Sequence, residues 1–526
     1  SGALLTQSLP DFKANSGLAY YYAFLLATLE QGSLNASLNG SELVSLCAQD
    51  LSDGVADGMN RGTAILQANG VAMGGALCSS GLIAAAFSLV SQSGSSSGTT
   101  TIYSNSGVDL AVAQNAVTSA TAASAGSIGA SANSSGAITT LEYYDTNGKP
   151  QKRVYVAGRS YGLGIVNVNN PASPVAENSS ALNQLIKANG MNSVGGVIAV
   201  SNSGKPALIL FDYSSPTVLK VDLTNNTVSK LTLTIKGTLS FSGASAVIAG
   251  GMLDTVNGGV WLATADGMPK IDPVTMKGVS IIAAPANTVN NENIGGDPSL
   301  SLVLSPDYEG DGAAMVAYKL NEGKAYTQSI AEWKTLFPQI PNYELDQVSM
   351  DTAYKVAVVT SEEVPILSLL HAPGISFNST AMSMSIPAAA TAQLDLRNDS
   401  KGISCTGIYR LSGSATDANS HLTLLASGNT SSLAVVSLKD PATGMGTSAY
   451  RSFDYADFYS AGDPHGIGTA TLTDKRSYGF VLTGDNELLM IDLKNFLAAP
   501  TNAGCDTKLA SDPVKNTTIT KVINLN

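Results

Sequence analysis

The sequence predicts a mainly β protein, a β-propeller of about seven blades preceded by a small all-α N-terminal domain. Three observations lead to this prediction. Short β-rich runs recur along residues 137–526, apolar helical segments are confined to residues 1–125, and a Ser/Gly/Ala-rich linker at 126–136 separates the two regions. One blade cannot bury both of its faces alone, so blades stack radially until the ring closes.

The N-terminal region contains several segments with helical character. Residues 18–29 (LAYYYAFLLATL) are apolar almost all round, which favours a helix enclosed by others. Ser41 is expected to begin a second helix, and residues 82–90 and 110–123 supply two more. Residues 71–90 carry no charge and are long enough to span a membrane. Small residues dominate them and flanking anchors are missing, so we predict a buried helix and no transmembrane span.

The β-rich region repeats one design: an apolar strand, a tight polar turn, and a second strand that often ends in Asp or Asn. Seven units occupy residues 154–168, 207–223, 260–272, 314–320, 355–370, 422–438 and 478–493. Most lie 50 to 58 residues apart, and a short fourth and a long fifth interval predict an insertion near 371–412. Periods of about 40 to 50 residues with several strands each are typical of propeller blades. Residues 517–525 alternate like a strand and are expected to close the ring against the first blade.

Four segments resemble known families. Residues 155–175 read YVAGRSYGLGIVNVNNPASPV and resemble the LVIVD repeat of bacterial surface proteins, with Asn167 where that repeat usually has Asp. Residues 207–228 and 478–493 are similar to YVTN-type propellers. Residues 41–62 (SELVSLCAQDLSDGVADGMNRG) are similar to a segment near the N-terminus of some bacterial surface lipoproteins, which carry a mature N-terminal Cys where this chain has Ser1. These resemblances imply a propeller at the cell surface and name no ligand.

Composition bears on location and partners. Charged residues make up 13% of the chain, which also has 51 glycines, and such charge-poor compositions are common in exported proteins. The chain begins at Ser1 without a signal peptide, which indicates a mature form whose leader was removed. We therefore predict an extracellular or cell-surface location. The net charge of −12 argues against nucleic acid as a partner, because phosphate binding needs a clustered basic face, and it disfavours anionic membranes.

The chain has four cysteines: Cys47, Cys78, Cys405 and Cys505. None forms a C-x-x-C motif, so a zinc ribbon, a thioredoxin-like site and c-type haem attachment are unsupported. Two lie in the predicted helical region and two in the β region, which predicts the disulfides Cys47–Cys78 and Cys405–Cys505. Four buried free thiols are the alternative.

One acidic segment has the opening of a calcium loop. Asp307, Glu309 and Asp311 alternate and precede a glycine, so their carboxylates can converge on a hard cation. Met315 and Tyr318 stand where the closing ligands belong. A solvated acidic hairpin is therefore favoured over a calcium site, and no other cofactor is predicted.

Catalytic motifs are missing. The three histidines, His371, His421 and His465, are dispersed along the chain. A turn places His465 beside Asp463, a pair that can act as a base, but no G-x-S-x-G or other nucleophile motif accompanies it. The Asp boxes of sialidase propellers are also absent. The sequence therefore predicts no catalytic or cofactor-binding residues and a protein that is not an enzyme.

Three functions remain. The first is a non-enzymatic extracellular scaffold or binding module whose partner is a protein or a surface polymer. The second is a structural subunit of a surface layer or filament, assembled through residues 1–125 or the chain ends, for example by strand addition. The third is a hydrolase or lyase with an unrecognised motif, which predicts carboxylates and a histidine converging at one mouth of the central channel.

Overall fold

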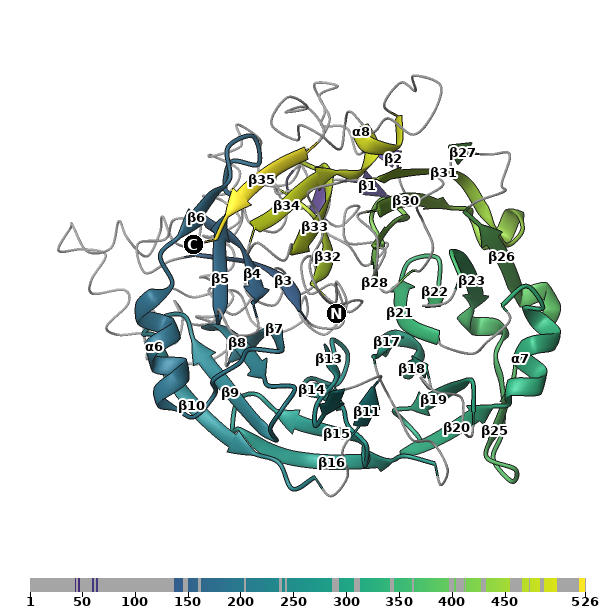
Figure 1. Cartoon of the computed structure of the whole chain (residues 1–526), viewed down its shortest axis with the longest axis horizontal. Helices are drawn as coiled ribbons and strands as arrows, with labels where there is room; N and C mark the ends of the chain where they lie inside the picture. The colour runs from purple at the N-terminus through teal and green to yellow at the C-terminus, as the bar shows by residue number, and fades with distance from the viewer. Residues whose placement is uncertain are drawn as a thin grey trace, which may run out of the picture. The chain divides into compact units, whose positions relative to one another are not determined.

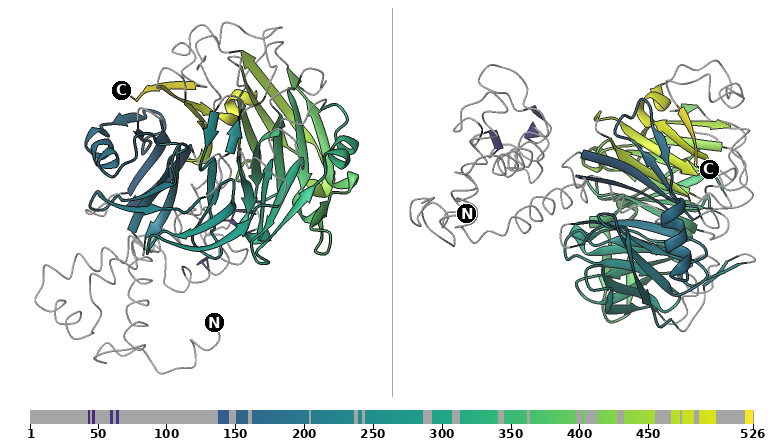
Figure 2. Two further views of the ribbon diagram at one scale, coloured as in Figure 1. Left: turned by 60° about the horizontal axis from the view of Figure 1, so that its bottom comes forward. Right: turned by 90° about the vertical axis from the view of Figure 1, so that its left-hand side faces the viewer.

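The computed structural model describes residues 137–498 with short gaps, residues 520–525, and the N-terminal residues 43, 46, 47, 59, 60, 63 and 64. The gaps are 145–149, 159–161, 203–204, 236–238, 242–243, 286–292, 307–312, 341–344, 362–363, 397–401, 404–410, 412, 427–431, 455–465, 473 and 483–486. Seven sheets of four or more strands surround a common centre (Figures 1 and 2). This confirms the predicted mainly β fold and the seven-bladed arrangement.

The first three blades follow the chain in order. Blade 1 consists of β3 (Ile138–Tyr144), β4 (Pro150–Ala157), β5 (Leu163–Asn167) and β6 (Val175–Glu177). Blade 2 consists of β7 (Gly196–Asn202), β8 (Lys205–Phe211), β9 (Thr217–Asp222) and β10 (Thr227–Thr232). Blade 3 consists of β13 (Gly250–Leu253), β14 (Val260–Ala263), β15 (Gly267–Asp272) and β16 (Lys277–Ala283).

The other four blades have the same antiparallel order. Blade 4 consists of β17 (Gly295–Asp297), β18 (Leu302–Pro306), β19 (Met315–Lys319) and β20 (Lys324–Gln328). Blade 5 consists of β21 (Leu345–Asp351), β22 (Val356–Ser361), β23 (Ile366–His371) and β26 (Thr391–Asp395). Blade 6 consists of β28 (Gly413–Asp417), β29 (Leu422–Ala426), β30 (Ser432–Leu438) and β31 (Thr447–Asp454). Blade 7 consists of β32 (Ile467–Thr471), β33 (Ser477–Leu482), β34 (Glu487–Asp492) and β35 (Thr520–Asn524).

Smaller elements decorate the ring. Two outer edges gain a parallel strand: β25 (Ser383–Ser385), paired with β24 (Ser376–Asn378), joins β20, and β27 (Gly402–Ile403) joins β31. A hairpin of β11 (Leu239–Phe241) and β12 (Ala244–Ala246) lies between blades 2 and 3 in the chain. The helices are α6 (Ser180–Ala188), α7 (Ile330–Leu336) and α8 (Leu493–Ala498), and the 3-10 turns are η4 (Pro298–Leu300), η5 (Ala372–Gly374), η6 (Ala388–Ala390) and η7 (Pro441–Thr443).

Burial changes from the middle strands of a blade to its outer edge. All residues of β9 and β22 are buried, because neighbouring blades cover both faces of these strands. In contrast, β10 and β16 at the outer edge are mostly exposed. The seven units predicted from sequence fall on the strands of this buried middle. Hydrophobic clusters join blades 2–3, 3–4, 4–5, 5–6, 6–7 and 7–1, so apolar packing between adjacent sheets builds the ring.

Glycines allow the innermost strands of adjacent blades to approach closely. A Cβ on Gly295 of β17 would lie 2.3 Å from the carbonyl oxygen of Val348 on β21. A Cβ on Gly251 of β13 would lie 2.8 Å from a methyl carbon of Ile198 on β7. At Gly295 the atom met belongs to the backbone, so a side chain there would push blades 4 and 5 apart, whereas at Gly251 the end of the Ile198 side chain can move.

The ring closes without an exchange of strands between its first and last blades. The strand predicted at 517–525 is β35, which pairs with β34 and completes blade 7. Its Ile523, and Leu525 just after it, pack in the hydrophobic cluster shared with blade 1. The amine of buried Lys152 in blade 1 also bridges Glu142 and the carbonyl oxygen of Thr471 in blade 7, at 3.1 and 3.2 Å.

The described N-terminal residues include both helical residues and a short β-hairpin. Leu43, Leu46 and Cys47 are helical, near the helix start predicted at Ser41. However, β1 (Met59–Asn60) pairs with β2 (Thr63–Ala64) as a small hairpin, which the all-α prediction does not include. The rest of the predicted helical domain and the 126–136 linker lie outside the described residues. Among the described helices, none has the length and apolar character needed to cross a bilayer.

Candidate functional site

The first turn of blades 4, 5 and 6 follows one pattern. We call residues 297–301, 351–355 and 417–421 the inner turns, because each joins the innermost strand of its blade to the second strand. Each begins with an aspartate: Asp297, Asp351 or Asp417. One carboxylate oxygen of each aspartate accepts hydrogen bonds from backbone amides of its own turn, such as the amides of Ala353 and Tyr354 at 2.9 and 2.8 Å from Asp351. This is the local reason for an aspartate there, since its side chain holds the turn.

The fifth residue of each inner turn has left-handed backbone geometry. The φ angles are 50° at Ser301, 58° at Lys355 and 58° at His421. Non-glycine residues adopt this conformation infrequently. Here it closes a five-residue turn, and in blades 5 and 6 the side chain at this position reaches the preceding blade.

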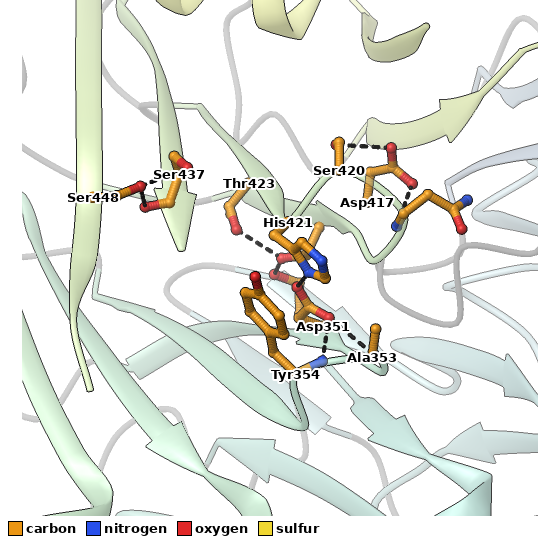
Figure 3. A network of polar contacts seen from close by, with 12 residues as sticks. Asp351, Ala353, Tyr354, Asp417, Ser420, His421, Thr423, Ser437 and Ser448 are labelled. Atoms are coloured by element: carbon orange, nitrogen blue, oxygen red, sulfur yellow. Dashed lines mark hydrogen bonds and ion pairs between the residues drawn. The ribbon is translucent and has the colours of Figure 1, made fainter. Parts of the chain in front are cut away.

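The second carboxylate oxygen of two of these aspartates binds the next blade. The amine of Lys355 lies 2.6 Å from Oδ2 of Asp297, and Nδ1 of His421 lies 2.8 Å from Oδ2 of Asp351. We call Asp297–Lys355 and Asp351–His421 the interblade pairs. They link blade 4 to blade 5 and blade 5 to blade 6 at equivalent positions of the turns, and Figure 3 shows the second pair.

Asp417 continues the series towards blade 7 with a different partner. Its Oδ2 accepts a hydrogen bond from the hydroxyl of Thr471 at 2.9 Å, and Asn419 also donates to that hydroxyl. The first turn of blade 7 also contains a residue with left-handed backbone, Lys475 with φ 62°, but its register differs, since Thr471 pairs with Ser477. The aspartate is thus retained while the group that meets it changes from blade to blade.

The imidazole of His421 is held on two sides. Its ring stacks on Tyr354, with ring centroids 3.5 Å apart and planes 1° from parallel. The carboxylate of Asp351 is fully buried, whereas 27% of the His421 side chain is exposed. Burial, together with the negative charges of Asp440 and Asp351, raises the pKa of Tyr354. The histidine therefore stacks on an uncharged phenol at neutral pH.

The interface between blades 5 and 6 is polar along its inner strands. On β21, alternate residues face opposite blades: Val348 and Met350 belong to the cluster with blade 4, and Ser349 faces blade 6. The Ser349 hydroxyl meets Thr416 at 2.8 Å, and Thr416 meets Thr423 at 3.0 Å, so three buried hydroxyls form a chain. Nearby, the side-chain oxygen of Gln347 accepts a hydrogen bond from the Ser414 amide at 2.8 Å. Apolar packing of these two blades lies further out.

A histidine beside a buried aspartate is also the pair that hydrolases use as a general base. In enzymes that use a side-chain nucleophile, such a base hydrogen-bonds a serine, threonine or cysteine. Within the described part of the chain, no serine, threonine or cysteine side chain hydrogen-bonds to the imidazole, and the Ser420 hydroxyl donates to Asp417 at 3.0 Å instead. The neighbouring pair has a lysine in the same place, so the shared feature is a cation or donor that joins two blades.

Most residues singled out from sequence lie elsewhere or outside the described residues. Asp307, Glu309 and Asp311 lie in the segment 307–312 between β18 and β19, which is outside the described residues. Cys78, Cys405, Cys505 and His465 also lie outside the described residues. Cys47 is buried, and no free cysteine occurs among the described residues, but both disulfide pairings stay predictions. His371 ends β23 and is not part of the cluster around His421. In the described part of the chain, no group of three or more His, Cys, Asp or Glu side chains is placed to hold a metal ion.

His421 stands out in the sequence as one of three histidines, whereas its partner, Asp351, does not. The two residues are 70 positions apart and share no local motif. A signal exists in the repeat itself: DPSLSL, DTAYKV and DANSHL all have Asp first, a variable fifth residue and an aliphatic sixth. Aligning these three segments would place Ser301, Lys355 and His421 in one column.

Blade 7 contains a separate polar cluster. The phenol of Tyr478 donates a 2.7 Å hydrogen bond to Asp474, and Arg476 contacts both Asp474 and Asp492. Burial, reinforced by the hydrogen bond to Asp474 and its charge, raises the pKa of Tyr478 well above the ordinary value of about 10. The neutral phenol is thus favoured in the folded protein.

We expect Tyr478 to stay protonated where ordinary tyrosines ionise. Stability should fall as pH rises above about 10, because the unfolded chain then releases a proton that the folded chain retains. Ultraviolet titration of the wild type and Tyr478→Phe checks this. The number of tyrosines that titrate near pH 10 should be the same in both proteins, and one fewer in the variant would contradict the assignment.

The fold defines this chain as a seven-bladed β-propeller, and the comparisons with known proteins go no further. No protein-family model matches the sequence, and no curated protein matches it. Among solved structures, hydrazine synthase from Kuenenia stuttgartiensis is similar at 10% identity and a TM-score of 0.38, covering 62% of this chain and 85% of that chain. A functionally unknown protein from Desulfotomaculum acetoxidans is similar at 8% identity and a TM-score of 0.39, covering 71% and 96%. Neither similarity carries a conclusion about what this chain does.

Proposed function

We propose that this chain is a non-enzymatic β-propeller that acts as a scaffold or binding module outside the cell or at its surface. One observation supports the non-enzymatic part most directly. The Asp351–His421 pair occupies the same turn position as Asp297–Lys355, and a lysine cannot replace the imidazole as a general base of the same kind. A feature repeated with changed chemistry in consecutive blades is best explained by a structural role.

Exposed apolar side chains support a binding role. Seven large apolar residues are exposed in the described part of the chain, and four of them, Val256, Val274, Val279 and Ile281, belong to blade 3. Val279 and Ile281 lie on the outer strand β16, with 60% and 53% of their surface exposed. Exposed apolar surface that gathers in one region is typical of interaction sites. The partner in this proposal is a protein or a surface polymer.

A structural subunit of a surface layer or filament is the second candidate, since the same blade 3 residues would serve contacts between copies. Light scattering of the native protein, with negative-stain imaging of the same sample, distinguishes a binding module from a structural subunit. We expect single particles near the chain mass of 53.7 kDa. The wild type could instead form regular polymers, and the double variant Val279→Ser/Ile281→Ser could reduce them to single particles. That result would make the structural subunit the leading function.

The enzymatic alternative has its own test. Wild type and His421→Lys are assayed on ester, glycoside and peptide substrates. We expect no turnover above buffer by either protein, because the equivalent Asp297–Lys355 pair supports a structural role for the contact that His421 makes. Turnover by the wild type that is lost in folded His421→Lys would overturn the proposal.

A further inference from the structure

The outer strand of blade 3 has an open edge on the rim of the ring (Figure 1). β16 pairs with β15 on one side, and no described strand pairs with its other side. In two other blades the chain itself covers this edge, since β25 adds to β20 of blade 4 and β27 adds to β31 of blade 6, both in parallel. These added strands are three and two residues long. The outer edges of this propeller therefore accept short extra strands.

The backbone of β16 directs hydrogen-bonding groups to this open edge. The amide of Ala284, just after the strand, donates to the carbonyl oxygen of Asp266 at 3.1 Å. Pro269, opposite Ile281, has no amide to donate. Hydrogen-bonded and non-hydrogen-bonded pairs alternate along an antiparallel ladder. The N–H and C=O groups of Ile281 and Ala283 therefore point away from β15, where an added strand can meet them.

The side chains beside this edge are apolar. Ile282 packs in the hydrophobic cluster shared with blade 4, so Ile281 lies on the opposite face, where more than half of its surface is exposed. Val279 is exposed to a similar extent and occupies a β-bulge, which ends the regular part of the edge. The regular edge is thus as short as the strands that add to blades 4 and 6, and aliphatic side chains flank it.

The exposed charges near this edge are positive. Among the described residues of 175–285, the charged side chains that are exposed are Lys187, Lys230 and Lys277, whereas the carboxylates are buried or half-buried. Lys277 begins β16, and Lys230 lies on β10, the outer strand of the preceding blade. This rim therefore presents positive charge on a chain whose net charge is −12. Its charge complements an acidic partner.

We propose that β16 binds an extended segment of a partner protein as a fifth strand of blade 3. The segment has aliphatic residues at alternate positions and acidic residues at its ends. In strand addition, main-chain hydrogen bonds supply affinity and contacts to alternate side chains supply specificity. The open backbone groups favour a peptide over a polysaccharide, because a peptide has amides and carbonyls at the matching spacing. The inference rests on the proposed binding function and gives its partner a chemistry and a place.

One backbone substitution and one side-chain substitution test the site in the full chain. Ile281→Pro removes the outward N–H without removing a hydrogen bond to β15, and proline is tolerated on edge strands where the N–H points outward. Val279→Ser/Ile281→Ser removes the aliphatic surface and keeps the backbone. The matched control is Val175→Ser, which removes a valine with 58% of its surface exposed from β6, the outer strand of blade 1.

The probes are two sets of short synthetic peptides, both with Val, Ile or Leu at alternate positions. One set has Asp or Glu at its ends and the other has Lys or Arg. Binding of the fluorescent peptides is measured by anisotropy. We expect the acidic set to bind the wild type and Val175→Ser equally, and to bind Ile281→Pro and the double serine variant at least about tenfold more weakly. The basic set should bind the wild type more weakly than the acidic set.

Acidic peptides that bind the double serine variant as tightly as the wild type would overturn the inference, and this result is available even if Ile281→Pro does not fold. The same holds if neither set binds, which would leave a surface polymer as the partner of the proposed binding module. Self-association of the wild type that Ile281→Pro abolishes would place a second copy at this edge instead and would also overturn it. The proposed function itself fails on regular polymers or on turnover, neither of which depends on peptide binding.

Discussion

Gly295→Ala is expected to destabilise the propeller by about 3 kcal/mol, the upper part of the range for overpacked cores. The added methyl carbon would lie 2.3 Å from the carbonyl oxygen of Val348 and 2.8 Å from its carbonyl carbon. Both atoms belong to the backbone of the next blade's innermost strand, so no rotamer change relieves the clash. Urea denaturation of the two proteins measures the difference.

The matched control is Gly278→Ala on β16. No atom lies within 4 Å of a Cβ at this position, which is on an exposed outer strand. Its effect on stability should be within about 0.5 kcal/mol of zero. If both alanine variants unfold at the same urea concentration as the wild type, the result would contradict the close approach of blades 4 and 5 at Gly295.

Asp351→Ala is expected to cost about 3 kcal/mol, because it leaves several polar groups without their partner. The variant loses the acceptor for the Ala353 and Tyr354 amides and for His421 at once. Asp351→Asn keeps one side-chain oxygen for the turn amides and should lose less. Unfolding curves of the three proteins give both differences.

Asp440→Ala is the control for loss of an aspartate that caps a turn at the surface. Asp440 is exposed, and its side chain accepts from the Ala442 amide at the start of η7. Loss of such a cap typically costs about 1 kcal/mol. An Asp351→Ala effect no larger than that of Asp440→Ala would show that the contact with blade 6 contributes nothing.

The sequence predicts the middle of each blade well. β8, β22 and β23 are almost entirely buried and read as largely apolar runs, because neighbouring blades cover both of their faces. The fourth predicted unit, residues 314–320, contains β19, the third strand of blade 4, and misses its second strand, β18. Counted from β18, the fourth interval is no longer short and the third interval becomes the short one.

The innermost strands are hard to predict for two physical reasons. β17 is three residues long and consists of two glycines and an aspartate. A side chain at Gly295 would clash with β21 of blade 5, and one at Gly296 would clash with β18 of its own blade. β21 alternates polar and apolar residues like a strand with one face in water, yet all of it is buried because its polar face meets polar groups of blade 6. The local sequence pattern does not distinguish a polar face exposed to water from a polar face buried against another blade.

The candidate site was less predictable than the fold. The sequence shows that the histidines are dispersed, but contacts between blades join residues about 60 to 70 positions apart, such as Asp297 with Lys355 and Asp351 with His421. The third functional hypothesis expects carboxylates and a histidine at one mouth of the channel, and Asp351, Asp417 and His421 do lie in adjacent inner turns. The equivalent lysine pair is what favours a structural role, and it becomes visible once the turns are superimposed.

A double-mutant cycle on each interblade pair tests the central claim most directly. The free energy of unfolding is measured for Asp351→Ala, His421→Ala and the double variant, and for the same set at Asp297 and Lys355. If both pairs join neighbouring blades, both cycles should give coupling energies of about 1–2 kcal/mol. Coupling at Asp297–Lys355 with none at Asp351–His421 would contradict the claim and make a role for His421 in chemistry the better explanation.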